Sequence, residues 1–184
     1  MIMKELDNFQ QIVLSLIKRS PGLGKVQLNK GLFLFDSLYY AFHKKSFTGC
    51  TYIKEKYGPV PENKFFMKLN NILNKYTKQD TEYKGFYEKT SYYVLPNIKI
   101  PEFNDELNNL LVIVVNFISN KTAKELSKLT HDDIYEKTKK RQEIPFEDIV
   151  KWKIDKPENT NTKVYARELT KEDETEILEI CSNN

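Results

Sequence analysis

The sequence predicts a mainly helical α+β domain with a small antiparallel β element. Three observations support this prediction. Apolar residues recur at helical spacing in several segments, two short segments alternate as strands do, and one segment near residue 30 is apolar around most of its circumference. A helix of the last kind is usually buried. We therefore expect the other elements to pack around one central helix.

The bulk composition is typical of one globular domain. The chain has 184 residues, of which 40% are apolar and 30% are charged. This length is enough for one hydrophobic core and too short for two domains of ordinary size. Its 29 basic and 26 acidic residues give a net charge of only +3, which disfavours a dedicated nucleic-acid binder. Its apolar runs are too short to cross a bilayer, and its first residues lack a signal-peptide pattern. We expect a single cytoplasmic domain over residues 1–184, with no membrane association.

The first part of the chain contains two helical segments. Apolar residues from Leu6 to Ile17 fall on one helical face, and Ser20-Pro21-Gly22 ends that helix. The next helix, from about Lys25 to Phe42, is the apolar one and is predicted to be central and buried. Asp36 is its anomalous member, because a carboxylate in a core needs a hydrogen-bonding partner or a route to water.

The stretch Tyr57-Gly58-Pro59-Val60-Pro61 follows a predicted strand, Thr51–Lys56, and precedes a predicted helix. Each proline fixes its own φ and favours extended geometry in the residue before it. Pro61 suits the first position of the helix, where its missing N–H is not needed. Gly58 allows the close approach of a core group or a partner. We predict a stiff structural joint, and a surface that a partner protein contacts is the alternative.

The second half of the chain is predicted to contain a hairpin, a long helix and shorter helices. The hairpin strands are placed at about Gly85–Lys89 and Ser91–Leu95, and the long helix begins near Asn104. Thr122–Glu125 has the spacing of a capping box at the next helix start. Residues 153–184 are predicted to form a surface loop and an acidic C-terminal helix.

Candidate catalytic and metal-binding residues are few. A Cys-His nucleophilic pair would need Cys50 beside His43 or His131. As a metal ligand, His131 would need Asp132 or Asp133 together with residues from elsewhere. No local spacing supports either arrangement, and the chain lacks a glycine-rich phosphate loop. We predict no catalytic residue, no cofactor and no metal site, and a Cys-His enzyme is the third-ranked hypothesis.

The order of the elements allows a DNA-binding alternative. Two helices, a strand, a third helix and a hairpin are similar in order to a winged helix, whose recognition helix reads DNA. That helix would be the one after Pro61, with the exposed candidates Asn63, Lys64, Lys68, Asn70, Asn71 and Lys75. DNA is therefore a second, less favoured partner, and loss of Lys64 and Lys68 should weaken its salt-dependent retention.

Three segments form an ordered set of motifs. They are VQLNKGLFLFD, FTGCTYIKEKYGPVPEN and ELSKLTHDDIYE, and they lie between residues 26 and 136. Together they resemble the Panacea family, the SocA-like antitoxins of bacterial toxin–antitoxin systems. The residues that match the family motif are Lys30, Asp36, Thr48, Gly49, Tyr52, Leu126, Thr130 and His131. The sequence departs from the pattern at Gln27, Gly31 and Phe33.

The resemblance implies a mostly helical Panacea-like core over residues 1–152. It implies that the protein neutralises a co-encoded toxin by direct binding. For some members it also implies delivery of the toxin to a protease, so a cytoplasmic protease or chaperone is a further expected partner. Because prophages and mobile elements carry this family, an interaction protein encoded by a phage or mobile element is an alternative.

A protein that acts by association needs an exposed apolar or aromatic surface. The chain has 11 Tyr and 11 Phe, and tyrosine is favoured at interfaces because its ring buries area while its hydroxyl keeps a polar contact. We expect the binding surface at the hairpin and at the edge formed by residues 57–61. Its predicted members are Tyr57, Gly58, Pro59, Val60, Pro61, Tyr83, Phe86, Tyr87, Tyr92 and Tyr93. The alternative is that these rings cover the central helix.

Overall fold

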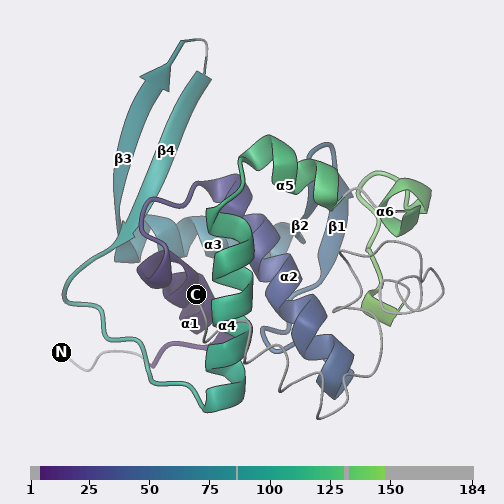
Figure 1. The fold of residues 1–184 in the computed structure, drawn as a ribbon, viewed down its shortest axis with the longest axis horizontal. Helices are drawn as coiled ribbons and strands as arrows, with labels where there is room; N and C mark the ends of the chain where they lie inside the picture. Colours follow the sequence, from purple (N-terminus) through teal and green to yellow (C-terminus); the bar gives the residue numbers. More distant parts are fainter. Residues whose placement is uncertain (1–4, 86, 131–132, 148–184) are drawn as a thin grey trace.

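The computed structural model describes residues 5–85, 87–130 and 133–147. In this part of the chain, six helices and two two-stranded antiparallel sheets form a mainly helical α+β fold, as the sequence predicts (Figure 1). The predicted loop and helix of residues 153–184 lie outside the described residues, as do Phe86 and His131.

The centre of the fold consists of α1 (Asn8–Arg19) and α2 (Lys25–His43). Asp7 caps α1 by accepting a hydrogen bond from the backbone N–H of Gln10, and the Gln10 side chain accepts one in return. The α2 helix passes behind α4 and α5 in Figure 1, and its buried residues include Leu28, Lys30, Leu32, Phe35 and Asp36. The prediction of a central buried helix is confirmed.

Close packing of three helices explains one departure from the family pattern. The α4 helix (Asp105–Ser119) begins after its N-cap Asn104, where the sequence predicts. At Gly31 a Cβ atom would lie 2.9 Å from Cδ1 of Ile118 on α4 and 3.2 Å from Cδ1 of Leu16 on α1. Any larger side chain would push α2 away from both neighbours, because core atoms are already in contact there.

The stretch Gly58–Pro61 is a strand, so its prediction as a joint between strand and helix is wrong. It forms β2 and pairs antiparallel with β1 (Tyr52–Glu55). The backbone of Lys54 bonds outward to residues 141 and 142, and Lys54 lies opposite Pro59. Tyr52 likewise bonds outward to Ile144 and lies opposite Pro61. Both prolines thus occupy positions where an N–H would point away from β1, and the ladder loses no hydrogen bond.

The next helix begins later than predicted. The Glu62 N–H donates to the Thr51 carbonyl at 2.9 Å and so continues the ladder past Pro61. The α3 helix therefore runs over Asn63–Tyr76 with Glu62 as its N-cap, and Pro61 is not its first residue. On its inner face Leu69 and Ile72 are buried, and Phe65 and Tyr76 pack against the core.

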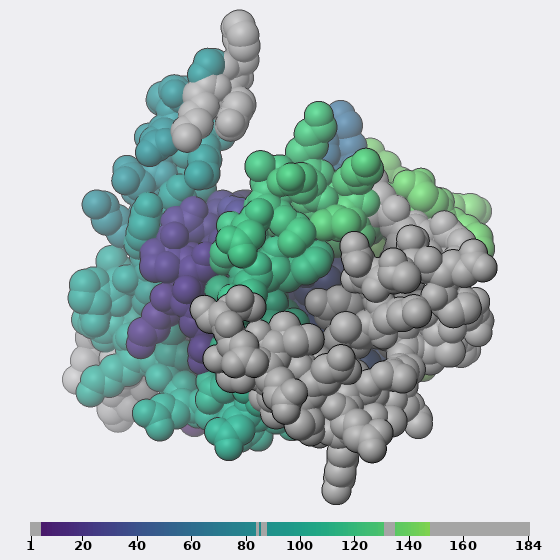
Figure 2. Space-filling model, in the orientation of Figure 1, coloured from purple at the N-terminus to yellow at the C-terminus, as the bar shows by residue number. Residues whose placement is uncertain are grey.

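The second hairpin differs from its prediction in length and register. Its strands are β3 (Thr77–Lys84) and β4 (Tyr87–Val94), and Gly85 adopts a positive φ of 66° in the connection, which is typical of hairpin turns. The predicted first strand is thus part of the connection and of β4. The hairpin projects from the helical body (Figures 1 and 2). Because it buries few side chains there, its sequence carries little hydrophobic alternation to indicate the register.

Two short helices complete the described fold. The capping box of Thr122 and Glu125 starts α5 (Ala123–Leu129), as predicted, and α6 (Asp133–Lys137) follows. Residues 141–144 then run beside β1. None of the helices in the described ranges combines the length and the apolar character needed to cross a membrane.

Candidate functional site

The Asp36 carboxyl group on α2 is fully buried and accepts four hydrogen bonds. Its Oδ1 accepts from the backbone N–H groups of Phe47 at 3.0 Å and Thr48 at 3.1 Å. Its Oδ2 accepts from the Tyr52 hydroxyl at 2.7 Å and from the Thr48 hydroxyl. Burial raises the pKa of Asp36, and the hydrogen bonds from Thr48 and Tyr52 oppose that rise. Asp36 thus has the partners that the sequence indicated it must have, and it fastens β1 to the central helix.

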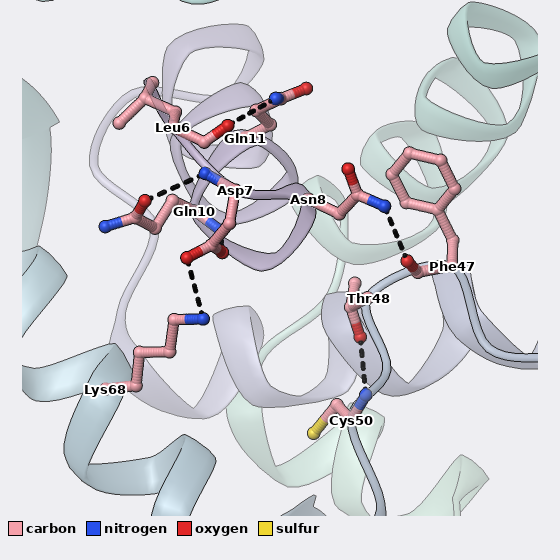
Figure 3. A network of polar contacts seen from close by, with 9 residues as sticks. All are labelled: Leu6, Asp7, Asn8, Gln10, Gln11, Phe47, Thr48, Cys50 and Lys68. Carbon is pink, nitrogen blue, oxygen red and sulfur yellow. Dashed lines mark hydrogen bonds and ion pairs between the residues drawn. The ribbon is translucent and has the colours of Figure 1, made fainter. Parts of the chain in front are cut away.

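The loop before β1 is also held from its other side (Figure 3). The Asn8 side-chain amide donates to the Phe47 carbonyl at 3.1 Å, and the Cys50 N–H donates to the Thr48 hydroxyl at 3.1 Å. Gly49 turns the chain there with a φ of 70°, a conformation that glycine adopts without steric cost. The motif residues Thr48 and Gly49 therefore lie in the loop from α2 to β1, which is bonded to α2 through Asp36 and to α1 through Asn8.

Lys30 is a buried lysine beneath β2. Its side chain is 1% exposed, and its Nζ donates to the Pro59 carbonyl at 3.1 Å. Gly58 has a φ of 100°, and a Cβ atom there would lie 2.1 Å from that Nζ. Burial lowers the pKa of Lys30 to about 7. The glycine of the Tyr57–Pro61 stretch is therefore required by a core lysine rather than by an exposed surface.

The same hairpin is covered by the segment around α5 and α6. The Tyr135 hydroxyl accepts from the Gly58 N–H at 3.2 Å and donates to the Glu55 carbonyl. A Cβ at residue 58 would also lie 2.7 Å from Oγ1 of Thr130. Leu126 is fully buried below them. Tyr135 is not among the predicted site residues; its place in the third motif segment was the one signal for it.

The predicted binding surface is divided by the structure. Gly58, Pro59 and Pro61 are buried, and Tyr57 beside them is 61% exposed. On the other hairpin, Tyr83 is 81% exposed. There Tyr92 is only 7% exposed and Tyr93 is 38% exposed, while the side chain of Tyr87 lies outside the described part. The two hairpins are separate in Figure 1, with α5 between them in that view. Exposed aromatic area is therefore concentrated at two places, and binding at either stays a prediction.

The side chains considered for catalysis are engaged elsewhere. Cys50 is buried, and burial raises the pKa of its thiol, the opposite of what a nucleophile needs. His43 Nε2 lies 2.5 Å from Glu106 Oε1, and its ring stacks on Tyr39. Among the described residues, no group of three or more His, Cys, Asp and Glu side chains is placed to hold a metal ion.

The helix proposed for DNA recognition has a mixed outer surface. Lys68 Nζ lies 2.8 Å from Asp7 Oδ2, so part of its charge is neutralised at the surface (Figure 3). Met67 is 67% exposed on the same helix. These two features are less typical of a DNA-reading face than of a protein surface.

The fold and the motif residues define a scaffold, in which the buried polar groups Asp36 and Lys30 hold one loop and the β1–β2 hairpin on a central helix. A family model described as "Antitoxin SocA-like, Panacea domain" matches residues 28–134, from α2 into α6. The chain therefore belongs to the SocA-like antitoxin family with a Panacea domain. No curated protein and no solved structure matches it.

The buried Lys30 should make stability depend on pH. The unfolded chain keeps this lysine proton up to a pKa near 10.5, whereas the folded chain releases it near 7. Between these values the unfolded state binds more protons, so the free energy of unfolding should rise with pH. From pH 7.0 to 8.5 we expect an increase of about 1.5 kcal/mol, measured by urea unfolding.

Two variants isolate this effect. Lys30→Met removes the titrating group and should abolish the increase, whereas the exposed Lys124→Met should keep it. The pH range stops at 8.5 because the raised pKa values of Cys50 and Tyr52 lower stability at higher pH. Equal pH dependence in the wild type and in Lys30→Met would contradict the assignment.

Proposed function

We propose that this protein is a bacterial antitoxin that neutralises a co-encoded toxin by direct binding in the cytoplasm, without covalent chemistry. Membership of the SocA-like family carries the proposal, because that family implies a toxin partner. Six of the motif residues are buried, and several of them hold the scaffold together: Lys30, Asp36, Thr48, Tyr52, Leu126 and Thr130. We therefore expect the toxin to contact the exposed residues around that scaffold.

The projecting hairpin is the proposed contact surface. Tyr83 on β3 is the most exposed of the large apolar side chains in the described residues. It lies opposite Glu88 near the outer end of the ladder. Because this end projects from the helical body, the ring becomes buried only when another molecule covers it. Tyrosines of this kind contribute strongly to binding when a partner excludes water from them.

The test is co-expression with the product of the adjacent reading frame. That product alone should stop growth, this chain should restore it, and the two should elute together from a size-exclusion column. Tyr83→Ser should weaken the complex by about tenfold or more, a typical loss for a central aromatic contact. The matched control Met67→Ser removes an exposed apolar side chain on α3 and should leave the affinity unchanged.

The same experiment separates two routes of neutralisation. If the toxin persists in rescued cells, binding itself blocks its action; if it disappears, the antitoxin delivers it to a protease. Failure of rescue together with absence of a complex would reject the antitoxin function. An unchanged affinity of Tyr83→Ser would reject the hairpin as the contact surface.

A further inference from the structure

The β3 strand has a free edge whose hydrogen-bonding groups can be assigned. On the neighbouring strand, the Tyr92 N–H donates to the Leu23 carbonyl at 3.2 Å, and the Gly22 N–H donates to the Tyr92 carbonyl at 3.0 Å. Both backbone groups of Tyr92 thus point away from β3. Tyr92 lies opposite Gln79, and in an antiparallel ladder the outward pairs alternate. The N–H and C=O groups of Gln79, Thr81 and Tyr83 therefore point outward from the free edge of β3.

The other strand edges are occupied or closed. Residues 141–144 hydrogen-bond along β1. The outward positions of β2 are Pro59 and Pro61, which have no N–H to offer. The base of β4 is bonded to residues 22 and 23, which leaves fewer outward positions there than on β3. Within the described ranges no third strand pairs with β3, and the hairpin projects away from the helices (Figure 1).

We propose that the free edge of β3 binds an extended segment of the toxin, which adds to the hairpin as a third strand. This inference rests on the proposed antitoxin function and states how the partner is held. In strand addition, main-chain hydrogen bonds supply affinity and the side chains on the two faces supply selectivity.

A second copy of this chain is the competing occupant of the edge. Antiparallel pairing of β3 with its own copy must set outward residues opposite outward residues. Of the two registers that keep nearly all of β3 paired, one places Asp80 opposite Glu82 twice, and like charges directly opposite each other are destabilising. The other places Asp80 opposite the copy's Asp80 but also sets Lys78 opposite Glu82 twice, so charge does not disfavour it. We expect the chain without its partner to elute as a monomer from a size-exclusion column. A dimer that Thr81→Pro abolishes would show that a second copy occupies the edge and would overturn the proposal.

The two faces of β3 indicate the chemistry of that segment. Gln79, Thr81 and Tyr83 make one face uncharged, with an exposed ring at its outer end. On the opposite face, Asp80 is exposed and makes no ion pair with another residue of the described part. The segment that fits carries uncharged side chains toward Tyr83 and a basic residue opposite Asp80.

Proline variants test the edge through its backbone. Thr81 and Thr90 lie opposite each other, and their hydroxyls are 3.2 Å apart. Each has an outward N–H, on opposite edges of the hairpin, so each substitution by proline removes one outward donor and the same side chain. The probe is the purified product of the adjacent reading frame, titrated against the full chain. Thr81→Pro should raise the Kd by about tenfold or more, whereas Thr90→Pro and Thr81→Ala should stay within roughly threefold.

Amide hydrogen exchange tests the same edge without any substitution. In the labelled wild-type chain, the N–H groups of Gln79, Thr81 and Tyr83 should exchange at least about tenfold more slowly in the complex than alone, because they become bonded. Unchanged exchange in a formed complex, or unchanged Kd of a folded Thr81→Pro, would overturn strand addition and leave the antitoxin function standing. If the wild type neither binds nor rescues, the antitoxin function fails first and the inference with it.

Discussion

Replacing Gly58 with alanine is expected to lower the free energy of unfolding by about 3 kcal/mol. Two costs add: an L side chain at a φ of 100° is strained by about 1–2 kcal/mol, and the new Cβ would lie 2.1 Å from Lys30 Nζ and 2.7 Å from Thr130 Oγ1. The lysine must move, and its buried bond to the Pro59 carbonyl is then lost. Urea unfolding monitored by circular dichroism measures the change.

Gly49→Ala is the matched control for this substitution. Gly49 also has a positive φ, of 70°, yet no other atom lies within 4 Å of where its Cβ would be. It should therefore show only the backbone cost, about 1 kcal/mol. In a Gly58→Ala, Lys30→Ala double variant, the loss in free energy of unfolding should be smaller than the sum of the two single losses. The Lys30 substitution removes the atom that a Cβ at residue 58 would displace. Equal effects of Gly58→Ala and Gly49→Ala would show that Lys30 does not press on the hairpin.

Replacing Asp36 with alanine is expected to lower the free energy of unfolding by about 4 kcal/mol, or to prevent folding. The substitution leaves two backbone N–H groups and two hydroxyls without their shared acceptor inside the core. Buried polar groups that lose their partner cost about 1–3 kcal/mol each, although the hydroxyls can rotate to recover part of this. The measurement is again the free energy of unfolding from urea titration.

Asp36→Asn separates hydrogen bonding from shape at this position. Its amide oxygen can keep the two backbone donors, and its NH2 group can donate to the Thr48 and Tyr52 hydroxyls after they rotate. The loss should therefore be about half that of Asp36→Ala. Asp80→Ala on the exposed hairpin should change stability by less than about 0.5 kcal/mol. If Asp36→Ala were as mild as Asp80→Ala, the carboxyl group would not be the anchor of the loop.

Sequence patterns predicted the helices better than the hairpins. Helices such as α2 and α4 bury wide apolar faces, and burial imposes a periodicity that can be read along the chain. The β3–β4 hairpin projects and buries little, so its register left no such pattern. The β2 strand was missed for another reason. Prolines normally argue against a strand, and they are tolerated at Pro59 and Pro61 because of the direction in which those positions point.

The candidate site shows the same division. Asp36 stood out in the sequence because a carboxylate interrupts an apolar helix. Lys30 was singled out only as a residue of the family motif and not as a buried group, since lysines are normally solvated. Its burial follows from packing against residues far along the chain. Tyr135 likewise acquires its role only by reaching Gly58 across the fold.

By itself the sequence determined the helical class, the central helix, the need of Asp36 for partners and the resemblance to one family, because these depend on residue order and local periodicity. Tertiary structure alone decided that the backbone positions of Pro59 and Pro61 face away from β1, that Lys30 is confined under Gly58, and that one edge of β3 is free. Those features depend on which distant segments contact each other, and such contacts produce no periodic pattern of residues in the sequence.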